Sequence, residues 1–113
     1  MATLAVQNVI RTGLAPAYSA CAGGGDKFRP DAYTFLHVKN GSGGALTVTV
    51  VTPGTAAPDV PIADVAVSVP AAGERMIGPF PAHLFRNPTD DLADITYSGV
   101  TNLTIAVVRP SAP

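Results

Sequence analysis

Short segments in which apolar and polar residues alternate constrain this chain more than any other feature. The pattern recurs in residues 45–52, 64–69 and 103–109. In the last of these, Leu103, Ile105 and Val107 share one face because successive side chains of a strand point to opposite sides. Three half-buried strands in one short chain predict an antiparallel, all-β protein.

Other segments complete the predicted sheet structure. The expected additional strands are residues 33–39, 74–77, 94–97 and, at an edge, 3–10. Segment 33–39 is apolar on both faces, which is typical of a central strand covered on both sides. We expect hairpins between 33–39 and 45–52, joined by a Gly-rich turn, and between 94–97 and 103–109. Residues 82–86 are expected to form one helical turn.

Glycine and proline divide the chain into short pieces. With 11 Gly and 11 Pro in 113 residues, long helices are disfavoured. Segment 13–31 contains Pro16, Gly23 to Gly25 and Pro30 with few large apolar residues, so it is expected to lie outside the core. The predicted fold is a compact antiparallel β-sandwich or barrel at 32–113, preceded by an N-terminal arm and long loop at 1–31.

The alternation also predicts which side chains form the core. Aliphatic residues on the apolar faces of the strands are expected to be mostly buried, namely Leu36, Val38, Val48, Val50, Val67, Ile95, Ile105 and Val107. At this chain length about 65% of the surface of the unfolded chain can be buried, which is enough for one core without covalent staples.

The residues that carry chemistry are few and scattered. His37 and His83 are the only histidines, and neither lies beside a nucleophile motif. The carboxylates Asp90, Asp91 and Asp94 lack calcium-loop spacing, and Asp is common in turns. The single Cys excludes an intrachain disulfide and a multi-cysteine zinc site. We therefore expect no enzyme activity, no cofactor and no metal.

Composition bears on the partners. The net charge of -1 disfavours nucleic-acid binding, which requires a basic excess. No run reaches the roughly 20 apolar residues of a membrane-spanning helix, so a soluble chain without a membrane partner is expected. Only 13% of residues are charged, against about 25% in an ordinary soluble domain, while 47% are hydrophobic. Exposed apolar surface of this kind marks protein partners or self-association.

The N-terminal arm is the expected docking element. Its apolar residues are the candidate interface residues, namely Leu4, Val6, Val9, Ile10, Leu14 and Tyr18. A solvated tail has no need of such residues, and they gain burial only against another surface. The arm is therefore expected to order only when it binds a partner, while the β-domain folds without it.

Several motifs resemble a family of small proteins encoded by tailed bacteriophages. They are MATLAVQ at 1–7, TGLAP at 12–16, an Ala/Gly-rich stretch ending near Asp26, TFLHVKNG at 34–41, LTVTV at 46–50, VPAAGE at 69–74, GPF at 78–80 and TIAVVR at 104–109. Together they span most of the chain. The chain is thus similar to the capsid decoration, or head auxiliary, proteins.

The resemblance implies a virion structural protein without catalytic residues. Proteins of this kind bind the outside of the major capsid lattice, often as trimers, and stabilise the expanded head. The implied partners are the major capsid protein and the chain itself, as a homotrimer, on the capsid outer surface. Other possibilities remain open at this point: a head–tail or tail component, a carbohydrate-binding or adhesin-like β-sandwich module and, third, an enzyme.

Overall fold

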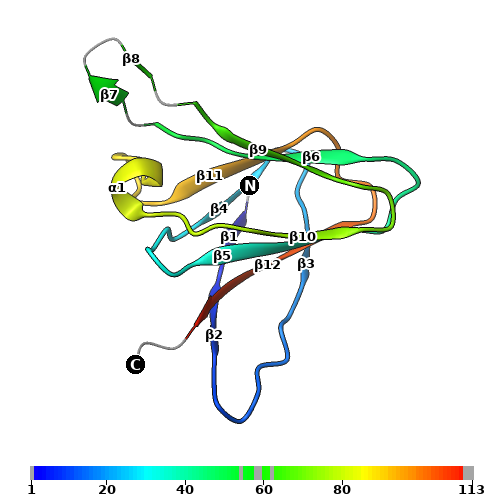
Figure 1. Ribbon diagram of the computed structural model, residues 1–113. Coiled ribbons are helices and arrows are strands. Elements are labelled where there is room, and N and C mark those ends of the chain that lie inside the picture. Colours follow the sequence, from blue (N-terminus) through cyan, green and yellow to red (C-terminus); the bar gives the residue numbers. More distant parts are fainter. Residues whose placement is uncertain (1, 54, 58–59, 62, 111–113) are drawn as a thin grey trace.

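Two β-sheets packed face to face form the body of the molecule (Figure 1). The computed structural model describes residues 2–53, 55–57, 60–61 and 63–110. In the first sheet the strand order is β1 (Ala2–Leu4), β4 (Asp26–Phe28), β11 (Ala93–Tyr97), β6 (Leu46–Val50) and β9 (Val65–Val69). In the second sheet it is β10 (Glu74–Ile77), β5 (Phe35–Asn40), β12 (Leu103–Pro110) and β2 (Val6–Val9), with β3 (Ser19–Ala20) also paired to β12. The predicted all-β sandwich is confirmed. Its sheets are mixed rather than purely antiparallel, because β1 pairs with β4 and β2 pairs with β12 in parallel.

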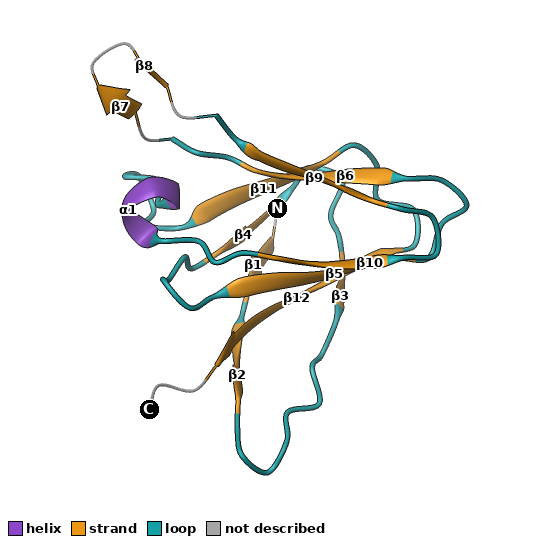
Figure 2. Cartoon of the chain, viewed as in Figure 1, coloured by secondary structure: helices purple, strands orange, loops and turns teal. Residues whose placement is uncertain are grey.

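The predicted strands are present within one or two residues of their expected bounds. Segment 74–77 matches β10, and the expected edge strand at 3–10 divides into β1 and β2, which join different sheets. The expected helical turn is α1 (Ala82–Phe85), at one end of the sandwich (Figure 2). A small separate ribbon pairs β7 (Thr55–Ala57) with β8 (Val60–Pro61). The described part of the chain contains no helix long and apolar enough to cross a bilayer.

Neither of the two expected hairpins forms. Strand β5 pairs with β10 and β12, whereas β6 lies in the other sheet between β11 and β9. Likewise β11 and β12 are consecutive in the chain but belong to opposite sheets. A connection of about five residues can either reverse the chain within a sheet or carry it across the roughly 10 Å to the facing sheet, and the alternation is the same in both cases.

Asn40 links the β5–β6 connection to the β9–β10 connection, which also crosses between the sheets. Its buried side chain donates from Nδ2 to the carbonyl oxygens of Gly44 and Val69 at 2.9 and 3.0 Å, while its Oδ1 accepts from Ser42. The backbone amide of Asn40 also donates to Gly73 O, on the connection between β9 and β10. The crossings are thus fixed by buried hydrogen bonds, which the apolar–polar pattern does not encode.

The core between the sheets follows the predicted faces. The predicted core residues Leu36, Val38, Val48, Val50, Ile95, Ile105 and Val107 are buried. Val67, on the edge strand β9, is half-buried and packs against this core. Phe80 adds an aromatic cluster at one end, with edge-to-face contacts to Phe28 and Phe85 at centroid distances of 5.4 and 5.0 Å.

The N-terminal region is part of this sandwich. Strand β4 lies between β1 and β11, and Phe28 is fully buried, so the expectation that 13–31 lies outside the core is wrong for this segment. Three residues are too few to show an alternation, and the inward position beside Phe28 is taken by a carboxylate, Asp26, rather than by an apolar residue. The chain therefore does not divide at residue 31 into an arm and a β-domain.

Candidate protein-binding surface

The outer faces of the two sheets differ in polarity. On the first sheet, the register places Thr96 beside Thr49 and Ala66, alternating with the buried Ile95 and Val50. Apart from the small Ala66, this row is polar, as expected for a sheet face in water.

The outer face of the second sheet is polar along the row of Glu74, Lys39 and Thr104 and becomes apolar toward Phe35. Its register aligns Met76 with His37 and Ala106, and Phe35 with Val108. These residues alternate with inward-facing residues of the core, so they point away from the first sheet. Segment 33–39 is therefore apolar on both faces, as its sequence indicated.

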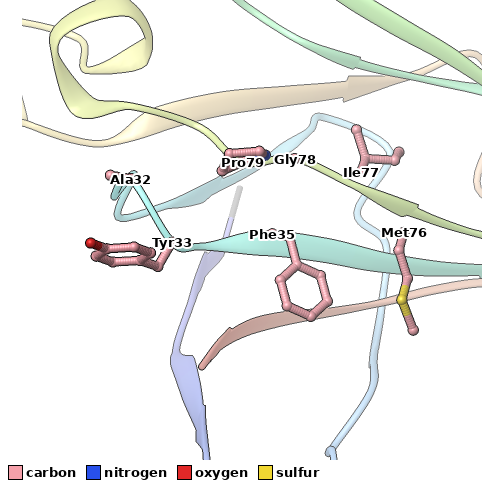
Figure 3. A pocket seen from close by; sticks show the side chains of 7 residues that line it. All are labelled: Ala32, Tyr33, Phe35, Met76, Ile77, Gly78 and Pro79. Atoms are coloured by element: carbon pink, nitrogen blue, oxygen red, sulfur yellow. The ribbon is translucent and has the colours of Figure 1, made fainter. Parts of the chain in front are cut away.

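Part of this outer face is exposed. Tyr33 and Met76 are 61% and 68% exposed, Phe35 is half-buried, and the three side chains project to the same side of the sheet (Figure 3). They line a shallow pocket of about 390 Å³. Val9, which is 41% exposed, lies on the same face, because β2 continues the register beyond β12. We call Val9, Tyr33, Phe35 and Met76 the outer apolar surface.

Tyr18 covers another part of the same face. Its ring packs edge-to-face on His37 at a centroid distance of 5.5 Å, and its hydroxyl shares a 2.6 Å hydrogen bond with His37 Nδ1. The ammonium of Lys39 lies 4.2 Å from the centre of the Tyr18 ring. Tyr18 is thus occupied within the chain, and it covers the ring of His37.

The other expected interface residues are divided between core and surface. Leu4 and Val6 pack against the core, and Leu14 is half-buried. Val9 and Ile10 remain exposed, at 41% and 50%. The loop from β2 to β3 projects from the sandwich (Figure 1), and its base is closed by two 2.8 Å hydrogen bonds between the Gln7 side chain and the Ala17 backbone. The structure therefore does not bring the six residues together as one arm surface.

The acidic segment considered for calcium pairs with cations of the chain itself. Lys27 Nζ lies 2.6 Å from Asp90 Oδ2 and 2.7 Å from Asp94 Oδ1, and Asp91 forms an ion pair with Arg86. The hydrogen bond to Asp90 raises the pKa of Lys27 and lowers the pKa of Asp90. No group of three or more potential metal ligands is present among the described residues. His83 is exposed on α1.

A buried polar cluster joins Cys21, Asp26 and Tyr97 inside the sandwich. The Tyr97 hydroxyl donates to Asp26 Oδ2 at 2.7 Å and is hydrogen-bonded to the Cys21 thiol. Asp26 Oδ2 also accepts from the Ala22 amide at 3.1 Å. Burial raises the pKa of the Cys21 thiol from 9.0 to about 11 and also raises the pKa of Tyr97. The thiol is therefore a poor nucleophile at neutral pH, and the cluster is structural.

The cluster predicts a loss of stability in mild alkali. The Cys21 pKa is higher in the folded chain, about 11 against 9.0, so deprotonation favours the unfolded state as the pH rises above 9. We expect the free energy of unfolding to fall by about 1 kcal/mol between pH 8 and 10. Urea unfolding at each pH measures it, and Cys21→Ala should remove most of the slope. An equal slope in that variant would assign the effect to other groups.

The sequence pattern alone does not reveal the outer apolar surface. Tyr33, Phe35 and Met76 belong to two different predicted strands, and only the sheet register brings them to one face. The available signal is the two-sided apolar character of 33–39, which is compatible with an apolar face that stays exposed as well as with a strand covered on both sides.

No family model, curated protein sequence or solved structure matches this chain.

Proposed function

We propose that this protein is a bacteriophage virion structural protein, a capsid decoration protein that binds the outside of the major capsid lattice and stabilises the head. The observation that carries the proposal is the outer apolar surface, in which Tyr33 and Met76 are largely exposed. The outer face of the first sheet, on the opposite side of the molecule, is mostly polar. Contiguous apolar surface on a small domain is typical of a protein-binding site. The sequence motifs that resemble those of decoration proteins support a capsid lattice as the partner.

The outer apolar surface replaces the N-terminal arm as the proposed docking element. A pre-ordered face binds without the ordering entropy of roughly 1–2 kcal/mol per residue that a flexible arm would lose. One copy buries a modest area, so repeated copies on a symmetric lattice, or a homotrimer, would raise the overall affinity through avidity. Bridging of neighbouring capsid subunits would then slow disassembly without any chemistry.

Two single lysine substitutions on opposite faces test this proposal. Met76→Lys places a charge on the outer apolar surface, and Thr96→Lys places the same charge on an exposed strand position of the first sheet. Burial of an unpaired ammonium at an interface is costly, so Met76→Lys should weaken binding at least tenfold. Thr96→Lys should bind within twofold of the parent protein. Co-sedimentation with expanded, undecorated heads measures both affinities.

Two further readings complete the experiment. Sedimentation of each variant alone shows whether Met76→Lys changes self-association rather than lattice binding. If the parent protein binds isolated tails but not heads, the protein belongs to another part of the virion. Equal binding of the two variants to heads would exclude the outer apolar surface as the docking site.

A further inference from the structure

A polar pocket of about 280 Å³ is lined by residues of β2, β12 and the segment that follows β4. The segment that follows β4 lies opposite the ends of β2 and β12, and the pocket lies between them. The residues that line it are Val6, Asn8, Arg29, Asp31, Thr34 and Arg109. Its lining residues are up to 103 positions apart in the sequence, from Val6 to Arg109, so no local sequence motif predicts the pocket.

The pocket has an excess of positive charge. Two guanidinium groups, those of Arg29 and Arg109, line it against the single carboxylate of Asp31. Asp31 Oδ1 lies 3.4 Å from Arg109 Nε and also accepts a 2.9 Å hydrogen bond from the Tyr33 amide. One cationic charge in the lining is therefore left without an anion from the pocket itself.

The pocket walls also contain buried donors without hydrogen-bond partners. Thr34 is fully buried, and its hydroxyl has no hydrogen-bond partner among the described residues. Arg109 Nε is likewise buried without a hydrogen bond, since its contact with Asp31 has ion-pair distance only. Buried polar groups of folded proteins are nearly always satisfied, so unpaired donors in the wall of a cationic pocket indicate a missing acceptor.

We infer that this pocket binds a carboxylate. A guanidinium presents its N–H donors in a planar fork that matches the two oxygens of a carboxylate. The charge favours the carboxylate over a phosphate dianion, because one negative charge neutralises the excess of the lining whereas two leave a net negative site. The inference stands on the pocket residues and is independent of the proposed function.

Nuclear magnetic resonance titration of the full chain tests the site with three probes. These are acetate, glutamate with its amino group acetylated and its α-carboxyl group amidated, and inorganic phosphate. All three are used at constant ionic strength. We expect saturable shifts at the amides of Asn8, Asp31, Thr34 and the side chain of Arg109, with a carboxylate probe binding more tightly than phosphate. If acetate binds as tightly as the glutamate derivative, the ligand is a small free carboxylate. If the glutamate derivative binds more tightly than acetate, the ligand is an acidic side chain of a protein.

Matched variants separate a built site from general electrostatics. Arg29→Gln removes an exposed cation of the pocket, and Arg75→Gln removes an exposed cation elsewhere. Thr34→Val removes the unpaired hydroxyl with little change in shape, so the free protein should be as stable as the parent or more so. Carboxylate affinity should fall at least fivefold in Arg29→Gln and Thr34→Val and stay within twofold in Arg75→Gln.

Three results would overturn the inference. Shifts that do not saturate, or that are equally reduced by Arg75→Gln, would show a nonspecific charge effect. Tighter binding of phosphate would exclude the carboxylate assignment. Full affinity in Thr34→Val together with Arg29→Gln would show that the pocket does not bind the probe.

Discussion

Replacement of Ile105 by alanine is expected to lower the free energy of unfolding by about 2–5 kcal/mol. Ile105 is 1% exposed in β12, where it pairs with Val38 on one side and Ser19 on the other. Truncation removes three carbon atoms from the centre of the sandwich, and the strands on both sides prevent the space from closing. Urea unfolding followed by circular dichroism measures the change in midpoint.

Two controls make this result specific to the core. Ile105→Val should cost only about 0.5–1.5 kcal/mol, because one methyl group is lost. Ile10→Ala makes the same truncation as Ile105→Ala at a residue that is 50% exposed, and its effect should stay within about 0.5 kcal/mol. If Ile105→Ala unfolds at the same urea concentration as Ile10→Ala, the inward orientation of β12 is incorrect.

Which residues face inward could be predicted because the information is local. The alternation in 46–50 and 103–107 specifies which side chains lie on one face, whatever the partner strand is. Burial of Val48, Val50 and Ile105 follows from that pattern alone. The half-buried state of Val67 does not, because Val67 and the fully buried Val69 share the same alternation in β9.

Strand pairing could not be predicted because it depends on long-range geometry. The connections at 41–45 and 98–102 have the composition of hairpin turns, yet both lead across the sandwich. The deciding contacts join residues distant in sequence, such as the 2.9 Å hydrogen bond from the Gly41 amide to Asn102 O. Inclusion of β4 in the first sheet likewise depends on β1 and β11.

The candidate sites show the same limit. The sequence predicted an apolar protein-binding surface from its low charge, but it assigned that surface to the N-terminal segment. Met76 joins Tyr33 and Phe35 only through the pairing of β10 with β5. The carboxylate pocket had no sequence signal, because Arg29 and Arg109 meet only after the two sheets pack.

Deletion of residues 2–9 is expected to destabilise the whole domain, by about 5 kcal/mol. Strand β2 pairs in parallel with residues Val107 to Pro110 of β12, and β1 pairs in parallel with β4. Removal of these strands leaves two strand edges unpaired and takes Leu4 and Val6 from the core. The expected loss is comparable to the total stability of a small domain, so the truncated chain should be largely unfolded.

Circular dichroism and urea unfolding of the truncated protein measure this effect, with full-length Ile10→Ser as the control. The control removes an exposed apolar residue of the same N-terminal region, so it should unfold like the parent. Because β1 and β2 pair with β4 and β12 of the sandwich, a loss of capsid binding after deletion would reflect unfolding rather than loss of a docking arm. A truncated protein that retains the parent's unfolding midpoint would instead show that 2–9 is separable from the sandwich, and the N-terminal segment would again be the candidate for docking.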